Sequence, residues 1–189
     1  MRIWVWPKTL VIYLALVLLG GYAVFASDWF QKKIIYPWPY ESLVHRYAVE
    51  YDVSPYLVAG VIMAESKFIT QARSPKGALG LMQIMPETAV WIAGQLQEEE
   101  FNPTSLHDPQ TNLQLGTWYL AYLNKEFGAN ETLVLAAYNG GPGNVRQWMN
   151  RYGWDADFAD VRQIPFAETR EYVTKVRKNK HHYEQLYGR

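Results

Sequence analysis

One glutamate in this chain stands where a predicted helix would surround it with apolar side chains. Ser54 is a favourable N-cap and Pro55 suits a first helical position, so Tyr56 to Ser66 is predicted to be helical. At about 100° per residue, Val58 lies roughly 20° from Glu65 on that helix. Burial raises the pKa of a carboxyl group. A glutamic acid that stays protonated near neutral pH can act as a general acid, although a solvated or merely hydrogen-bonded glutamate would also fit the pattern.

The segment that follows this glutamate is rich in glycine and contains no other carboxylate. Residues 74–86 read Ser-Pro-Lys-Gly-Ala-Leu-Gly-Leu-Met-Gln-Ile-Met-Pro, and no Asp or Glu occurs between Ser66 and Pro86. No second carboxylate therefore follows Glu65 closely in sequence.

Several other chemistries are excluded by what the chain lacks. It has no cysteine, which removes disulfides, thiolate zinc sites and a cysteine nucleophile. It contains no His-Glu-x-x-His motif, no phosphate-binding loop and no Gly-x-Ser-x-Gly elbow. Its formal net charge is +0, which gives no support for nucleic-acid binding. We therefore expect no metal, no cofactor and no nucleic-acid partner.

The N-terminus contains an uncharged apolar run from Leu10 to Ala26, preceded by Arg2 and Lys8. As a helix of about 1.5 Å per residue it would span roughly 26 Å, close to the roughly 30 Å hydrocarbon core of a bilayer. Two interpretations remain open: an uncleaved anchor in the cytoplasmic membrane, and a signal peptide cleaved after Ala26. Either one exports everything after Asp28. Residues 1–27 are thus an expected anchor or signal, and residues 28–39 a linker.

Residues 40–189 are expected to form one mainly α-helical domain. Thr70 to Ile84 is predicted to be loop or short irregular strand. The final helix is basic in its second half, which indicates a solvated face or contact with an anionic wall polymer or lipid surface. Helices are predicted over Tyr40–Tyr51, Tyr56–Ser66, Pro86 to about Gln95, Asp108 to about Glu126, Asn130–Gly140, Pro142–Gly153 and about Phe166–Leu186.

Four motifs occur together in an order and spacing that resemble the bacterial lytic transglycosylases of the soluble type. They are Glu65-Ser66, the segment from Gly77 to Pro86, Ala137-Tyr138-Asn139-Gly140-Gly141 and the segment from Ile164 to Val173. The resemblance spans about Tyr40 to Lys180. Because that family shares its fold with goose-type lysozyme, the resemblance implies a compact, lysozyme-like helical domain behind one N-terminal transmembrane helix.

The resemblance also implies a role for each matching side chain. Glu65 matches the single catalytic acid and base. Other positions match groups that bind the sugars: Ser74 near the N-acetyl group, Gln83 and Met85 beside the scissile bond, Tyr138 and Asn139 from the Ala-Tyr-Asn motif, Glu168 as a second carboxylate that supports sugar positioning, and Tyr172 packed beside Glu168.

The implied reaction is the non-hydrolytic cleavage of the β-1,4 bond between N-acetylmuramic acid and N-acetylglucosamine in peptidoglycan glycan strands. Glu65 would protonate the glycosidic oxygen while the acetamido oxygen attacks the anomeric carbon. As a carboxylate, Glu65 would then deprotonate the C6 hydroxyl, which closes a 1,6-anhydro ring. A hydrolytic lysozyme on the same fold and a non-catalytic peptidoglycan-binding module are the alternatives. The enzyme would act outside the cytoplasm, at the cell membrane or after secretion, and the sequence does not identify its protein partners.

Overall fold

The computed structural model describes residues 8–98 and 100–188. The chain divides between Pro37 and Trp38 into two compact units. The larger unit extends from Trp38 to Gly188 and contains every residue expected to take part in chemistry. Each unit is described by itself.

The N-terminal unit is a helix followed by a short helical extension. Helix α1 covers Lys8–Ala26, α2 covers Asp28–Phe30, and a π-helical turn, η1, covers Gln31–Ile35. Residues 28–35, expected to be linker, are therefore helical, because the Ser27 hydroxyl accepts the Phe30 N–H (3.3 Å) and the Gln31 amide donates to the Phe25 carbonyl (2.7 Å).

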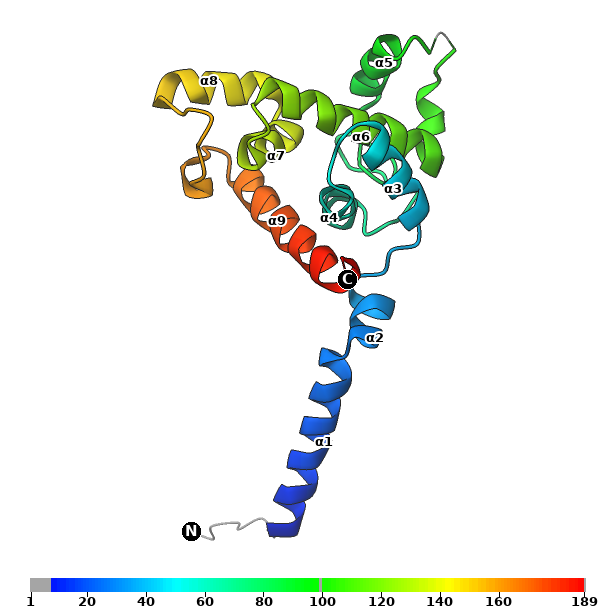
Figure 1. The fold of residues 1–189 in the computed structure, drawn as a ribbon, viewed down its shortest axis with the longest axis vertical. Helices are drawn as coiled ribbons and strands as arrows, with labels where there is room; N and C mark the ends of the chain where they lie inside the picture. The colour runs from blue at the N-terminus through cyan, green and yellow to red at the C-terminus, as the bar shows by residue number, and fades with distance from the viewer. Residues whose placement is uncertain (1–7, 99, 189) are drawn as a thin grey trace. The chain divides into compact units, whose positions relative to one another are not determined.

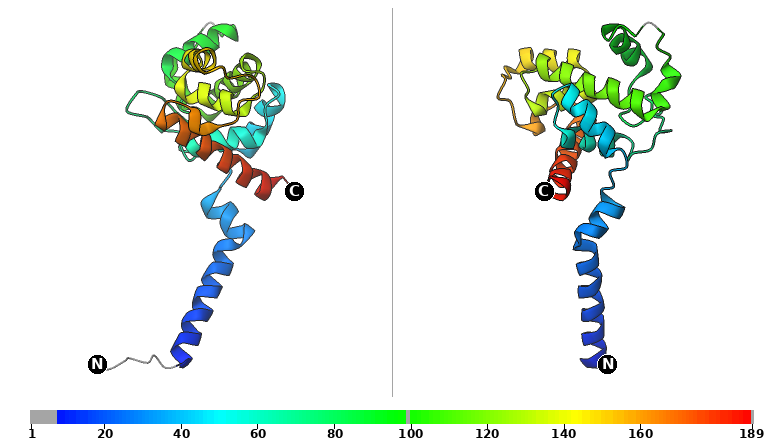
Figure 2. Two further views of the ribbon diagram at one scale, coloured as in Figure 1. Left: turned by 90° about the vertical axis from the view of Figure 1, so that its left-hand side faces the viewer. Right: turned by 45° about the vertical axis from the view of Figure 1, so that its right-hand side comes forward.

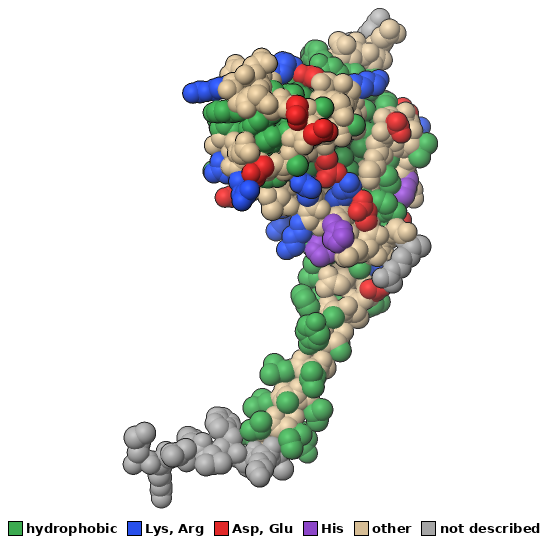
Figure 3. Space-filling model, turned by 60° about the vertical axis from the view of Figure 1, so that its left-hand side comes forward, with side chains coloured by type: hydrophobic (Ala, Val, Ile, Leu, Met, Phe, Trp, Pro, Cys, Tyr) green, Lys and Arg blue, Asp and Glu red, His purple; other side chains and the backbone are tan. Residues whose placement is uncertain are grey.

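Helix α1 exposes large apolar side chains along most of its length (Figure 3). Within the described residues, no single helix combines the length and apolarity needed to cross a bilayer. The segments Leu10–Ala26 and Asp28–Ile35 meet that test only together, and they are bent by 55° with respect to each other. The expected helix over Leu10–Ala26 is thus confirmed as a helix, while its insertion in a membrane stays a prediction.

The larger unit is built of helices joined by loops and two short 3-10 turns (Figure 1). In the predicted loop over Thr70–Ile84 the structure contains only isolated bridges, Arg73 with Leu79 and Leu79 with Ile84. The predicted helices are confirmed with small differences at their ends. Their bounds are α3 Glu41–Glu50, α4 Pro55–Glu65, α5 Pro86–Gln95, α6 Pro109–Glu126, α7 Glu131–Gly140, α8 Pro142–Tyr152 and α9 Ala167–Tyr187, with 3-10 turns at Pro103–His107 and Val161–Gln163.

Local capping sets several of these boundaries. The side chains of Ser54, Asp108 and Asn130 each accept a first-turn backbone N–H, at 3.4, 2.9 and 3.1 Å. These bonds satisfy donors that have no partner inside the helix. At the other end, α8 stops at Gly153, which adopts a left-handed conformation with φ +68°.

Helix α4 is the central element of the unit and packs between α3 and α9 (Figure 1). Six consecutive residues, Leu57–Ile62, are buried, so α4 is enclosed on all sides and has no single apolar stripe. The close approach of α9 requires Gly60, because a Cβ there would lie 2.9 Å from the Lys180 backbone nitrogen. The helix predicted over Tyr56–Ser66 is confirmed and has Glu65 as its last residue, but burial extends around the whole of α4 and is not confined to the predicted apolar stripe.

The first residue of this unit is fastened to the end of its last helix. The buried Trp38 ring has its centroid 5.4 Å from that of Tyr183 and 5.1 Å from that of Tyr187, both on α9. The C-terminal end of α9 lies at the opposite end of the unit from α5 (Figure 2). Aromatic packing of this kind fixes where the chain enters the unit.

Candidate active site

Glu65 is the last residue of α4, and the backbone immediately after it is tied to the glycine-rich loop. The Ser66 hydroxyl is buried and donates to the Leu81 carbonyl at 2.7 Å. Lys67 and Phe68 then adopt positive φ values of 53° and 64°, which turn the chain sharply away from the helix axis. This arrangement holds Glu65 at the point where α4 meets residues 74–85.

The environment of Glu65 favours its protonated form. Burial raises the pKa of this carboxyl group from 4.5 to about 7, and the negative charge of Glu168 acts in the same direction. The Tyr172 hydroxyl and the Lys175 ammonium stabilise the carboxylate and oppose the increase. The buried Tyr172 hydroxyl has no hydrogen-bond partner among the described residues, so it acts on the Glu65 carboxyl from beyond hydrogen-bond geometry. Glu65 is therefore close to half protonated at neutral pH, as a group that both donates and accepts a proton should be.

The glycine-rich loop is held in place by one buried side chain, Asn112 of α6. Its amide donates to the carbonyls of Leu79 (3.0 Å) and Leu106 (2.8 Å), and its oxygen accepts the Met82 N–H (2.8 Å). Gly80 fits against this amide with φ +75°, and a Cβ there would lie 2.1 Å from the Leu106 carbonyl oxygen. The glycine is required by both its conformation and the close approach.

Two tyrosines form the wall behind Glu65. The Tyr138 hydroxyl donates to the Met82 carbonyl at 2.8 Å, and its ring lies parallel to that of Tyr172, at 2° and with a centroid separation of 6.4 Å. Burial raises the pKa of both hydroxyls well above 10.0, and the charge of Glu65 adds to this effect. Both tyrosines therefore stay neutral and can only donate or accept hydrogen bonds.

A cleft of about 330 Å³ opens in front of Glu65. The loop residues Ser74 and Gln83 use their polar groups within the loop: Ser74 Oγ accepts the Ala78 N–H (2.9 Å), and the Gln83 amide donates to the Gly80 carbonyl (2.9 Å). Seven of the eight residues predicted from the sequence line this one cleft: Glu65, Ser74, Gln83, Met85, Tyr138, Asn139 and Glu168.

The eighth residue, Tyr172, is buried behind the cleft and does not line it. Its ring packs on that of Tyr138, while Glu168, one turn earlier on α9, has 71% of its side chain exposed. Glu168 forms an ion pair with Lys76 at 3.2 Å. A second hollow of about 460 Å³ continues beyond this pair and is lined by both residues together with Asn139 and Phe166.

Three residues at the site were missed by the sequence interpretation. Lys175 belongs to the basic part of the last helix, which was predicted to be solvated or to contact an anionic polymer or lipid surface. It donates to the Ala64 carbonyl at 2.6 Å and acts on the Glu65 carboxyl. Lys76 lines the cleft and forms an ion pair with Glu168. The Thr169 hydroxyl donates to the Asn139 side chain at 2.8 Å. Lys76 and Thr169 lie within segments that the sequence analysis had singled out, residues 74–86 and Ile164 to Val173, but nothing in those segments marked these two side chains.

The comparison with protein families shows to which family this chain belongs. The model of the Transglycosylase SLT domain family matches residues 42–161, more than half of the chain. The chain belongs to this family. The matched range contains Glu65, the glycine-rich loop and the Ala-Tyr-Asn motif, but it ends before Glu168 and Tyr172.

Curated relatives of this SLT-domain chain include soluble and membrane-bound transglycosylases. The soluble lytic murein transglycosylase of Salmonella typhimurium is 37% identical over 162 residues, which is 85% of this chain and 25% of the relative. The membrane-bound lytic murein transglycosylase C of Edwardsiella ictaluri is 32% identical over 168 residues, covering 78% of this chain and 47% of the relative. The chain thus spans a quarter to about half of the length of these proteins.

Solved structures of SLT-domain proteins share the fold. The 70-kDa soluble lytic transglycosylase of Escherichia coli superimposes with a TM-score of 0.77 at 32% identity, covering 89% of this chain and 30% of that one. An inactive glutamate-to-glutamine variant of the Pseudomonas aeruginosa enzyme gives a TM-score of 0.74 at 32% identity, covering 83% and 26%. The predicted family and its helical fold are therefore confirmed.

Proposed function

We propose that this chain is a peptidoglycan lytic transglycosylase in which Glu65 serves alone as acid and base. One observation carries the proposal. Among the described residues that line the cleft, Glu65 and Glu168 are the only carboxylates, and Glu168 is exposed and paired with Lys76. A second carboxylate in such a setting is poorly suited to stabilise a buried cation, so the substrate acetamido group is the better candidate for that task.

The proposed reaction has two steps at the anomeric carbon of N-acetylmuramic acid. Protonated Glu65 gives its proton to the glycosidic oxygen as the acetamido oxygen forms a bond to C1, and N-acetylglucosamine leaves. The Glu65 carboxylate then takes the proton of the C6 hydroxyl, whose oxygen attacks C1 and displaces the acetamido oxygen. A pKa of about 7 suits both steps, because the same group must donate and then accept a proton.

The surrounding side chains support the orientation of the sugar. Met85 and the flat wall formed by Tyr138 provide apolar surface for the sugar ring, and Asn139 offers an amide already oriented by Thr169. Ser74 and Gln83 keep the loop rigid through their internal bonds. Orientation of the C6 hydroxyl over C1, and exclusion of water from that face, would favour ring closure over hydrolysis.

Mass spectrometry of wall digests tests this function. Wild-type protein should release fragments that end in 1,6-anhydro-N-acetylmuramic acid, one water lighter than the reducing ends made by a lysozyme. Glu65→Gln, which keeps the shape of the side chain, should abolish release while it still binds sacculi. Digestion to reducing ends only would identify a hydrolase, and binding without digestion by the wild type would identify a non-catalytic module.

We further propose that residues 1–27 tether the enzyme to the cell envelope and that residues 40–189 form the catalytic domain. The apolar exposed surface of α1 supports an anchor, as does similarity to membrane-bound relatives. In bacterial membranes washed with alkaline carbonate, an anchored chain should stay in the pellet. Release into the supernatant with a new N-terminus at Ser27 would instead establish a cleaved signal peptide.

A further inference from the structure

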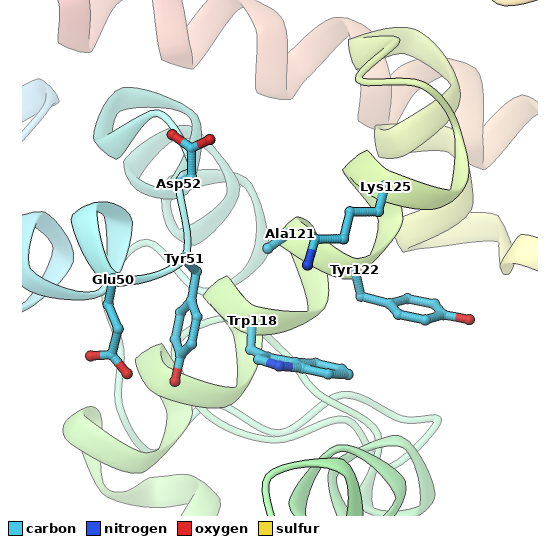
Figure 4. A pocket seen from close by; sticks show the side chains of 7 residues that line it. All are labelled: Glu50, Tyr51, Asp52, Trp118, Ala121, Tyr122 and Lys125. Atoms are coloured by element: carbon cyan, nitrogen blue, oxygen red, sulfur yellow. The ribbon is translucent and has the colours of Figure 1, made fainter.

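A second pocket, separate from the cleft, lies between the end of α3 and helix α6 (Figure 4). Its volume is about 300 Å³. Two of its lining rings, Trp118 and Tyr122, are one helical turn apart on α6, with planes at 12° and centroids 5.7 Å apart. Residues at this spacing share one face of a helix, so the two rings offer adjacent, nearly parallel surfaces.

Three charged side chains also line this pocket. Glu50 is the last residue of α3, Asp52 lies in the turn that follows, and Lys125 comes from α6 (Figure 4). None of the three takes part in a salt bridge within the described part of the chain. Burial and the neighbouring Glu50 raise the pKa of Tyr51 to about 12, which keeps its hydroxyl protonated as a donor. The rim therefore offers both donors and acceptors to a ligand.

This combination fits a saccharide better than other ligand classes. A pyranose ring has an apolar C–H face that can lie on an aromatic ring, and a polar edge of hydroxyl and acetamido groups. Two carboxylates beside one ammonium disfavour anionic ligands such as phosphates. A wholly apolar ligand would desolvate the three charged groups without giving them partners.

Aromatic contacts connect this pocket to the cleft. Trp91 of α5 lies 5.6 Å from Trp118 and 5.0 Å from Tyr122, measured between ring centroids. Tyr119 lies 6.3 Å from Trp91 and 5.6 Å from Tyr138, which lines the cleft. Trp91 is also 39% exposed. Rings suited to sugar contact thus extend from the cleft across α5 and α6 to the second pocket.

We infer that this pocket is a second saccharide-binding site that holds N-acetylated sugar units of a glycan strand. That the strand is peptidoglycan rests on the proposed function. The site would hold the polymer at a distance from the bond being cut. Such a second contact raises the effective concentration of the strand at the cleft without any change in the chemistry.

A two-probe NMR titration tests the inference. The full chain carrying Glu65→Gln, in detergent micelles, is labelled with ¹⁵N in the tryptophan indoles and ¹³C in the methionine methyls. The probe ligand is the tetramer of N-acetylglucosamine. The indole signal that is lost in Trp118→Phe belongs to Trp118 and reports on binding in the second pocket. The methyl signal of Met85 reports on binding in the cleft.

We expect the Trp118 indole signal to shift in a saturable manner. Lys125→Met, an exposed substitution at the rim, should weaken the binding seen by Trp118 several-fold and leave the Met85 isotherm unchanged. Tyr152→Ala, which removes an exposed aromatic side chain outside the pocket, should alter neither isotherm.

The possible outcomes separate this site from the proposed activity. A shift at Met85 with a stationary Trp118 signal would overturn the inference and leave the proposed function intact. A shift at Trp118 with a stationary Met85 would support the inference while contradicting sugar binding in the cleft. If both signals follow one isotherm that Lys125→Met does not change, Trp118 only reports binding in the cleft and the inference fails.

Discussion

Substitution of Glu65 by glutamine should stabilise the fold increasingly as the pH rises. In the folded protein, burial raises the pKa of Glu65 from 4.5 to about 7. Between these two values the folded state binds more protons than the unfolded state, so the stability of the wild type falls as the pH rises through this window. Each pKa unit corresponds to about 1.4 kcal/mol, which gives an upper estimate of about 3 kcal/mol for the ionised side chain. Glutamine is never ionised and avoids this cost.

Urea unfolding of the full chain in micelles, followed by tryptophan fluorescence, measures the effect. The quantity of interest is the difference in the free energy of unfolding between Glu65→Gln and the wild type, from about pH 4 to about pH 8, because other titrating groups cancel in it. This difference should change by up to about 3 kcal/mol in favour of glutamine. Glu87→Gln, at an exposed position in the first turn of α5, controls for the loss of one carboxyl group. A difference for Glu65→Gln that stays flat over this range would refute the argument from burial.

Four further substitutions test the supports of the site and the packing of α4 against α9. Tyr172→Phe removes a group that lowers the Glu65 pKa, so the alkaline limb of the pH–rate profile should move to higher pH. Glu168→Gln removes a group that raises this pKa, so the limb should move to lower pH. Movement of both limbs in the same direction, or of each in the direction opposite to that expected, would contradict the assignment. Asn112→Ala should lower the free energy of urea unfolding by about 3 kcal/mol or more, because it leaves three buried backbone groups without their partner; a loss well under 1 kcal/mol would show that the loop is held otherwise. Gly60→Ala should cost about 1–3 kcal/mol by forcing α4 and α9 apart, visible as a lower thermal midpoint, and an unchanged midpoint would mean that the helices adjust freely.

Helix positions could be predicted because their signals are local. The Asp108 carboxylate caps α6 by accepting the N–H of Thr111, three residues later, and Gly153 ends α8 through its own backbone conformation. Most residues of the cleft could be identified because they belong to recognisable short motifs, and Ser74 lies three residues before one of them. Neither inference required knowledge of which helices meet in space.

The groups that hold and tune the cleft could not be predicted, because their partners are distant in the chain. Lys175 bonds to a carbonyl 111 residues earlier, and nothing near it distinguishes it from other lysines on α9. The Asn112 side chain hydrogen-bonds to the backbone of Met82 and Leu79, 30 and 33 positions earlier in the chain. Asparagine inside a helix more often points to solvent or bonds to the nearby backbone. For Glu65 the burial was predicted correctly, yet it arises from enclosure of the whole of α4 and not from one apolar stripe.

The packing of Trp38 on the end of α9 has a mechanical consequence. Trp38 packs on Tyr183 and Tyr187, at the far end of the helix that also carries Tyr172, so part of any tension at Trp38 would pass to that helix. Tyr172 and Tyr183 are separated by about 16 Å of continuous helix at about 1.5 Å per residue. A force that reaches Trp38 would therefore act on the same continuous helix that carries Tyr172 behind the cleft.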